Sequence, residues 1–228
     1  MQQNLETRLF IGGKWIESSK SFPVVNPYTG EEIARVCVAD SQHVEKAVQS
    51  AESSAMASLT GARRHDILKN TAAEIQRRSS DLTALLIQET AKPMRYASAE
   101  VGRAVQTFSF AAEEARRLHG ETVELDAHPN GKGHFGFYHR FPLGTIAAIS
   151  PFNFPLNLVA HKLAPALAAG NAVILKPASS TPLIALALAG ILADSGAPEG
   201  AVNVVCGSGG EVGDALVAHP RIKMVTFT

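Results

Sequence analysis

Asn153 lies in the stretch SPFNFPLN, between two phenylalanines and two prolines and directly after an apolar run. A primary amide held rigidly in a dry pocket can donate a hydrogen bond to an oxyanion, which stabilises a transition state by roughly 3 kcal/mol. Asparagine also caps helices, and a helical pattern follows this stretch. The residues alone therefore leave two roles open for Asn153, an oxyanion donor or a helix cap.

Two further loops carry residues that could bind a ligand. Lys176 ends an apolar run, so its ammonium must reach either water at the surface or an anionic or hydroxyl-rich ligand such as a nucleotide. The turn GSGGEVG supplies Gly207, Gly209 and Gly213 before a predicted helix, where backbone amides can bind a pyrophosphate. Its spacing differs from the usual dinucleotide fingerprint, and a ligand-free tight turn has the same composition.

Strands and helices must alternate to position these loops. Short, β-branched apolar runs indicate strands at 145–150, 171–176, 201–206 and 223–228, and helical patterns separate them at 156–169, 182–193 and 210–218. This alternation predicts an α/β fold, a Rossmann-like open parallel sheet with flanking helices. Ligands bind beyond the carboxyl ends of such strands, and all three loops fall at those ends.

The remainder of the chain predicts supporting elements. An N-terminal β-meander is expected to cover a sheet edge, followed by a helix from Asp40, a helical hairpin over 60–93 and a long helix over 96–118. The polar, glycine-rich stretch 121–141 predicts a hairpin that projects and pairs with another subunit or with a later segment of the chain. Residues 1–120 and 142–228 then form a discontinuous dinucleotide-binding domain.

Composition narrows the classes of function. Lys and Arg together number 21, as do Asp and Glu, so the chain has no bulk attraction for nucleic acid or for an acidic membrane. The longest apolar stretch, from Leu183, is too short to span a bilayer, and the start does not resemble a secretory signal. Only Cys37 and Cys206 occur, without the spacing of a zinc site. We expect a cytoplasmic protein without a bound metal.

Several long stretches together resemble one family. They are GGKWIES (12–18), VVNPYTGEEIA (24–34), SPFNFPLNLVAHKLAPALAAGNAVILKPASSTP (150–182) and GAPEGAVNVVCGSGGEVGDALVAHPRIKMVTFT (196–228). Their order and spacing are similar to those of the aldehyde dehydrogenase superfamily. The resemblance implies NAD(P)-dependent oxidation of an aldehyde to the carboxylic acid through a cysteine thioester, by a homodimer or homotetramer.

The resemblance also implies a role for each matching position. The Asn153 amide would stabilise the oxyanion of the thiohemiacetal, Lys176 would bond the adenosine ribose, and Phe227 and Thr228 would approach the nicotinamide. Gly209 and Gly213 would border the adenine and pyrophosphate. The full cofactor-binding set implied is Ile149, Ser150, Pro151, Phe152, Lys176, Ala178, Ser179, Gly209, Gly213, Phe227 and Thr228.

Two departures from the family pattern carry expectations of their own. Many NAD-preferring members have a glutamate where Ser179 stands, and a serine there removes the repulsion of a 2′-phosphate, so NADP should be accepted as well as NAD. Neither Cys37 nor Cys206 occupies the position of the family's nucleophile, and Cys206 is predicted to be a core residue. The chain is therefore expected to be the amino-terminal, cofactor-binding part of a longer enzyme, inactive by itself.

Other functions stay open at this stage. The chain could be a non-catalytic dinucleotide-binding or interaction module, or part of an acylating enzyme that passes the thioester to coenzyme A. Lactaldehyde, semialdehydes and glyceraldehyde phosphate are all candidate substrates. By resemblance to some members, Arg103 could meet an anionic aldehyde at the substrate entrance, or it could be an exposed helix arginine without a ligand.

Overall fold

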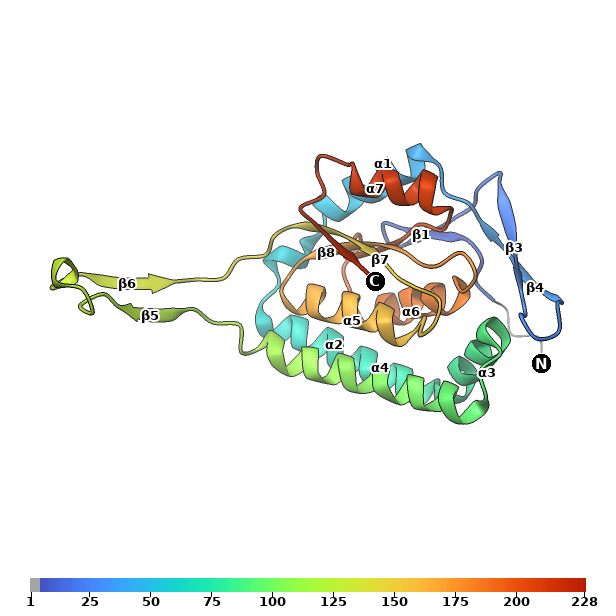
Figure 1. Ribbon diagram of the computed structural model, residues 1–228, viewed down its shortest axis with the longest axis horizontal. Helices are drawn as coiled ribbons and strands as arrows, with labels where there is room; N and C mark the ends of the chain where they lie inside the picture. The colour runs from blue at the N-terminus through green and yellow to red at the C-terminus, as the bar shows by residue number, and fades with distance from the viewer. Residues whose placement is uncertain (1–4) are drawn as a thin grey trace.

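The computed structural model describes residues 5–228 as a central sheet with helices on both faces and one long hairpin that leaves the body (Figure 1). The sheet has the strand order β10-β7-β8-β9-β1-β2. Four of its strands are mutually parallel, namely β7 (Thr145–Ile149), β8 (Ala172–Lys176), β9 (Val202–Val204) and β10 (Met224–Phe227). The predicted open parallel sheet is confirmed for this part of the fold.

The N-terminal strands differ from the single predicted meander. β1 (Leu9–Ile11) and β2 (Lys14–Ile16) form a hairpin that extends the sheet antiparallel to β9, so the sheet as a whole is mixed. Gly12 and Gly13 make its tight turn at φ values of 62° and 76°, which favour glycine. β3 (Ser21–Val25) and β4 (Glu32–Cys37) leave the edge and pair as a separate sheet.

Helices cover both faces of the sheet. α5 (Asn157–Ala168) and α6 (Leu183–Asp194) pack on one face, and α1 (Ser41–Glu52) packs on the other (Figure 1). Asp40 caps α1 by accepting a hydrogen bond from the His43 amide. The single helix predicted over 210–218 is instead a π-helical turn, Gly209–Gly213, followed by the short helix α7 (Asp214–Val217).

Three more helices form an outer layer over α5 and α6. They are α2 (Gly61–Arg77), α3 (Ser79–Thr90) and α4 (Met94–Ala115), preceded by the 3₁₀ turn Ala55–Ser58. Because α5 and α6 lie between this layer and the sheet, their apolar residues are buried on almost every side. Within the described residues, no helix combines the length and the apolar character needed to cross a membrane.

The polar segment 121–141 forms the projecting hairpin. β5 (Glu121–Glu124) and β6 (Phe135–Tyr138) pair antiparallel, with a 3₁₀ turn, Pro129–Gly131, between them (Figure 1). Phe135 and Phe137 are 76% and 73% exposed. The predicted projection is confirmed, and pairing of the hairpin with another subunit stays a prediction.

Candidate functional site

Three loops meet at the carboxyl edge of the parallel strands. The first follows β7 and begins where the Ser150 amide donates to the Lys176 carbonyl oxygen (3.2 Å). The second follows β8 and is joined to the third, after β9, by the Ser179 hydroxyl, which donates to the Gly207 carbonyl oxygen (3.0 Å). Residues from distant parts of the sequence therefore share one edge of the sheet, as strand polarity predicts.

Asn153 lies in the open part of this edge. Its side chain is exposed, as is Phe152 at 65%, so the expectation of a dry pocket is wrong for the described residues. The helix-cap role is wrong as well, because α5 begins at Asn157 and the amides of its start are bound to Glu100. Among residues 5–228, the Asn153 Oδ1 accepts only from the Phe154 amide (3.1 Å). Its NH₂ group thus stays accessible to a ligand.

Lys176 does not reach the surface. Its side chain is 5% exposed, which excludes the alternative of a lysine that extends to water at the strand end. Its Nζ donates to the Pro177 carbonyl oxygen (3.1 Å), and burial lowers the pKa of the ammonium. A Cβ atom added at Gly213 would lie 3.7 Å from the Cδ of Lys176, so the aliphatic part of the lysine side chain packs against the glycine turn.

The glycine turn leaves room beside its backbone. Ser208 caps it by accepting a hydrogen bond from the Glu211 amide (3.2 Å). A Cβ atom added at Gly209 or Gly210 would meet no neighbouring atom of the described residues within 4 Å. A flat ligand can therefore approach the backbone closely there. In the neighbouring loop, Ser179 is exposed and hydrogen-bonded to Gly207 of this turn, and Ala178 is partly exposed.

β10 contributes the remaining predicted cofactor residues. Phe227 pairs in register with Ile149 and is 74% exposed, which places the two side by side at the sheet edge. Thr228 accepts a hydrogen bond at Oγ1 from the Nζ of Lys162 (2.7 Å). Lys162 is a buried lysine on α5, and burial lowers its pKa. Its contact with Thr228 was not predicted from the sequence. The signal available in the sequence was a lysine in a predominantly apolar helix, whose other polar residues are Asn157 and His161.

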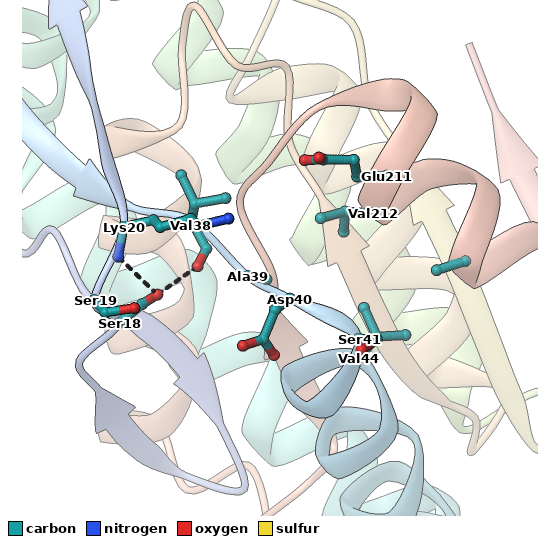
Figure 2. A pocket seen from close by; sticks show the side chains of 11 residues that line it. Ser18, Ser19, Lys20, Val38, Ala39, Asp40, Ser41, Val44, Glu211 and Val212 are labelled. Carbon is teal, nitrogen blue, oxygen red and sulfur yellow. Dashed lines mark hydrogen bonds between the residues drawn. The ribbon is translucent and has the colours of Figure 1, made fainter.

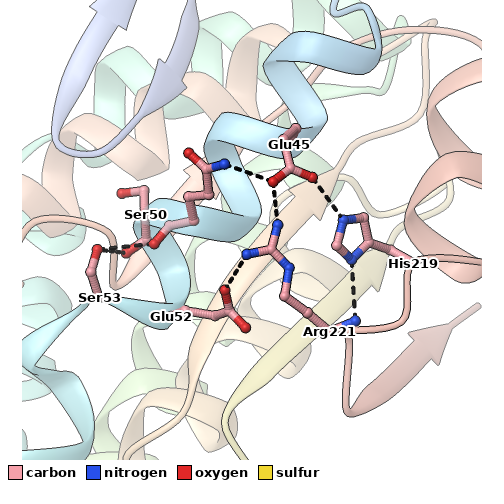
Figure 3. A network of polar contacts seen from close by, with 7 residues as sticks. Glu45, Ser50, Glu52, Ser53, His219 and Arg221 are labelled. Atoms are coloured by element: carbon pink, nitrogen blue, oxygen red, sulfur yellow. Dashed lines mark hydrogen bonds and ion pairs between the residues drawn. The ribbon is translucent and has the colours of Figure 1, made fainter.

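A network of charges holds the loop that leads into β10. Glu45 on α1 accepts from the His219 Nε2 (3.2 Å) and from Arg221, and Arg221 also donates to Glu52 (2.7 Å; Figure 3). Hydrogen bonds from His219, Arg221 and Gln49 lower the pKa of Glu45 to about 2. The network attaches the segment before β10, through His219 and Arg221, to α1.

Both cysteines are unsuited to nucleophilic attack. Cys37 and Cys206 are buried, and burial raises the pKa of Cys206 to about 12. The prediction that Cys206 is a core residue is confirmed. Within residues 5–228, no group of three or more His, Cys, Asp or Glu side chains is arranged to hold a metal ion.

A cavity of about 290 Å³ adjoins the glycine turn without including the predicted site (Figure 2). Its walls come from the loop before β3, the start of α1 and the turn itself: Ser18, Ser19, Lys20, Val38, Ala39, Asp40, Ser41, Val44, Glu211, Val212 and Ala215. A second, apolar groove of about 420 Å³ runs between α4 and α5, past Thr107 and His161. This groove lies on α4 and α5, the two helices next to the Asn153 loop.

Comparison with known proteins gives one consistent result. The model of the aldehyde dehydrogenase family matches residues 15–228. The chain is 39% identical to 3-sulfolactaldehyde dehydrogenase of Priestia megaterium over 96% of its own length and 46% of that protein. It is 43% identical to aspartate-semialdehyde dehydrogenase 1 of Pseudomonas canavaninivorans over 90% of its own length and 44% of that protein.

Solved structures agree in fold. An NADP-dependent enzyme of E. coli superposes with a TM-score of 0.90 at 33% identity, covering 97% of this chain and 46% of that one. Betaine aldehyde dehydrogenase of Staphylococcus aureus in complex with NAD⁺ also gives a TM-score of 0.90, at 28% identity. The match covers 97% of this chain and 44% of that one. The chain thus spans less than half the length of these relatives.

Proposed function

The chain belongs to the aldehyde dehydrogenase family, and we propose that it supplies the cofactor-binding part and the oxyanion donor of an enzyme that oxidises an aldehyde to its acid with NADP⁺ or NAD⁺. The observation that carries the proposal is the convergence of three loops at one sheet edge, with Ser179 bonded to Gly207 and Lys176 packed against Gly213. Asn153 is accessible beside them.

In this proposal the Asn153 NH₂ group donates to the oxygen that becomes negative when a thiolate attacks the aldehyde carbon. The thiolate comes from outside these residues, because Cys37 and Cys206 are buried. A bound nicotinamide would supply the acceptor for the hydride. Hydrolysis of the resulting thioester, by a water that a glutamate outside these residues would activate, would release the acid and the free thiol. The task of this chain is to place the amide and to hold the cofactor.

The residues around the crevice fit a dinucleotide. Within the described residues Lys176 has no carboxylate partner, so its buried ammonium has donors left for the ribose hydroxyls. Gly209 and Gly210 leave space for a close approach of the adenine half. Ser179 presents a hydroxyl where a carboxylate would repel a 2′-phosphate, so we propose that NADP⁺ is accepted.

We further propose that the substrate is an anionic aldehyde. Arg103 is exposed on α4, and its guanidinium lies 4.9 Å from the centroid of the Phe154 ring, next to Asn153. A sulfonate or carboxylate a few bonds from the aldehyde could reach it while the carbonyl oxygen faces the amide. The relatives named for 3-sulfolactaldehyde and aspartate semialdehyde act on aldehydes with such groups.

The projecting hairpin supports an oligomer. Its strands expose Phe135 and Phe137 and leave backbone donors and acceptors unpaired at both edges, which suits pairing with a second copy. We propose a homodimer or homotetramer in the complete enzyme, assembled through residues 121–141.

The decisive test uses the complete product of the reading frame that encodes these residues. It should reduce NADP⁺ with 3-sulfolactaldehyde or a semialdehyde, and Asn153→Ala should lower kcat by about 100-fold or more with little change in cofactor affinity. Binding of NADP⁺ without oxidation of any aldehyde would favour a non-catalytic module. Oxidation that requires coenzyme A would identify an acylating enzyme. A product that binds neither cofactor would refute the proposal.

A further inference from the structure

Glu100 is a fully buried carboxylate that reaches from α4 to the start of α5. Its Oε1 accepts from the backbone amides of Leu156 (3.0 Å) and Asn157 (3.1 Å). α5 has no cap from its own sequence, because its N-cap residue is Leu156. The first turn of the helix that follows Asn153 is therefore bound to a residue that precedes it by more than fifty positions.

The second oxygen of Glu100 binds Lys92. The Lys92 Nζ lies 2.5 Å from Oε2 and 4.1 Å from the centroid of the Phe154 ring. Lys92 thus joins the buried carboxylate to the aromatic face of the residue that follows Asn153. A cation on a ring face and a charge-assisted hydrogen bond fix the same ammonium from two sides.

Glu89 shows that capping does not require the lysine. It is 2% exposed and accepts from the amides of Leu183 (2.6 Å) and Ile184 (3.0 Å), and so caps α6 with both oxygens. No ion pair to Glu89 occurs among the described residues. Two neighbouring helices thus receive buried glutamate caps, and only the cap beside Asn153 has a lysine attached. A buried glutamate can therefore cap a helix in this fold without a lysine beside it.

We propose that Lys92 and Glu100 are positioning residues that hold the Asn153 amide in its catalytic direction. Glu100 fastens the backbone at Leu156 and Asn157, and Lys92 fastens the Phe154 ring, so the loop is held at two points on the carboxyl side of Asn153. Neither residue touches the reacting atoms. The inference rests on the proposed role of Asn153 as the oxyanion donor.

The test is Lys92→Met in the complete reading-frame product, with aldehyde oxidation as the readout. Methionine keeps the length of the side chain and leaves the Glu100 cap in place, but it removes the ammonium from the Phe154 ring, while the Arg103 guanidinium stays 4.9 Å from the ring centroid. We expect kcat to fall by about 10- to 100-fold, with the Kd for NADP⁺ unchanged, because a small displacement of a catalytic group costs this much. Lys92→Arg should restore most of kcat, and Lys69→Met, an exposed lysine on α2, is the matched control.

Glu100→Gln provides an independent variant. Its amide oxygen can still accept from α5, whereas its NH₂ group faces the Lys92 ammonium and displaces it. The two variants should lower kcat to the same extent, and the double variant should be no worse than either, since they break one unit. Additive losses would show that the residues act separately and would overturn the proposal.

Amide hydrogen exchange distinguishes a positioning role of Lys92 from a purely structural role in the folding of α5. In Lys92→Met the Leu156 and Asn157 amides should stay protected, because the cap remains. Loss of protection throughout α5 would show a purely structural role and would overturn the inference. Wild-type kcat in Lys92→Met, alongside an inactive Asn153→Ala, would also overturn it while leaving the proposed function intact. Full activity in Asn153→Ala would instead remove the proposed role of the amide, and this inference with it.

Discussion

The buried cap Glu89 allows a prediction about stability and pH. Glu89, on α3, is 2% exposed, and its two side-chain oxygens accept from the first two amides of α6. The substitution Glu89→Gln keeps the shape of the side chain and one acceptor, and it removes the ability to ionise. The variant therefore mimics the protonated form of the wild-type residue at every pH.

Burial raises the pKa of Glu89 from 4.5 to about 8, against the lowering effect of the Leu183 and Ile184 amides. A group whose pKa is raised on folding stabilises the protein fully below the unfolded value, and that stability is lost as pH rises through the folded value. The wild type should thus lose free energy of unfolding between pH 4.5 and about 8 through this group. This pKa shift corresponds to a loss of at most about 5 kcal/mol in the free energy of unfolding.

The assay is urea unfolding of the wild type and Glu89→Gln at a series of pH values from about 5 to about 9, which spans the interval over which this group changes charge. The two proteins should have similar stabilities at the acidic end, and Glu89→Gln should become the more stable one as pH rises. Other titrating groups are common to both proteins and cancel in the difference. A constant difference, or one that moves in favour of the wild type, would show that the helix amides keep the carboxylate ionised and would refute the reasoning.

Four further outcomes are expected. Ser179→Glu should weaken NADP⁺ binding by about 10- to 100-fold in calorimetry and leave NAD⁺ binding unchanged, because the new carboxylate repels the 2′-phosphate. An NADP⁺ affinity equal to that of the wild type would contradict this. Arg103→Met should raise KM for an anionic aldehyde by about tenfold or more and leave a neutral one unaffected; equal effects on both would reject a charge-specific contact. Gly200→Ala should lower the free energy of unfolding by at least about 1–3 kcal/mol in urea titrations, since the new Cβ would lie 2.1 Å from the Ser50 carbonyl oxygen at a φ of 75°. Deletion of 124–140 should reduce the oligomeric state in sedimentation, and an unchanged state would exclude the hairpin as the interface.

The parallel half of the fold was predictable because its sequence is locally unambiguous. The run NAVILK is apolar from Ala172 to Leu175, and AVNVVC is apolar except at Asn203. Such runs are typical of strands buried on both faces, and glycine or proline bounds each of them. The N-terminal strands are shorter and have fewer distinctive residues. Whether β3 and β4 joined the main sheet or left it depended on long-range packing, which no local pattern records.

The candidate site was predictable only in part. Strand polarity brought the three loops to one edge, but the exposure of Asn153 and the burial of Lys176 depend on which elements cover them. Glu89 and Glu100 were hidden for a different reason. Each looks like one more charged residue on an amphipathic helix. The amides that Glu89 binds lie 94 and 95 positions further along the chain, and those that Glu100 binds lie 56 and 57 positions further along.

The exposure of Asn153 bears directly on how the amide could assist catalysis. A donor in water gains little over water itself, so stabilisation of an oxyanion requires that solvent be excluded when substrate and cofactor are bound. Orientation, in contrast, can be fixed beforehand. Glu100 and Lys92 hold the loop through contacts that are already formed in this structure, with Glu100 fully buried and Lys92 partly buried. If the amide is aimed during folding, closing the site has only to remove water, and no further reorganisation of the loop is needed at the moment of reaction.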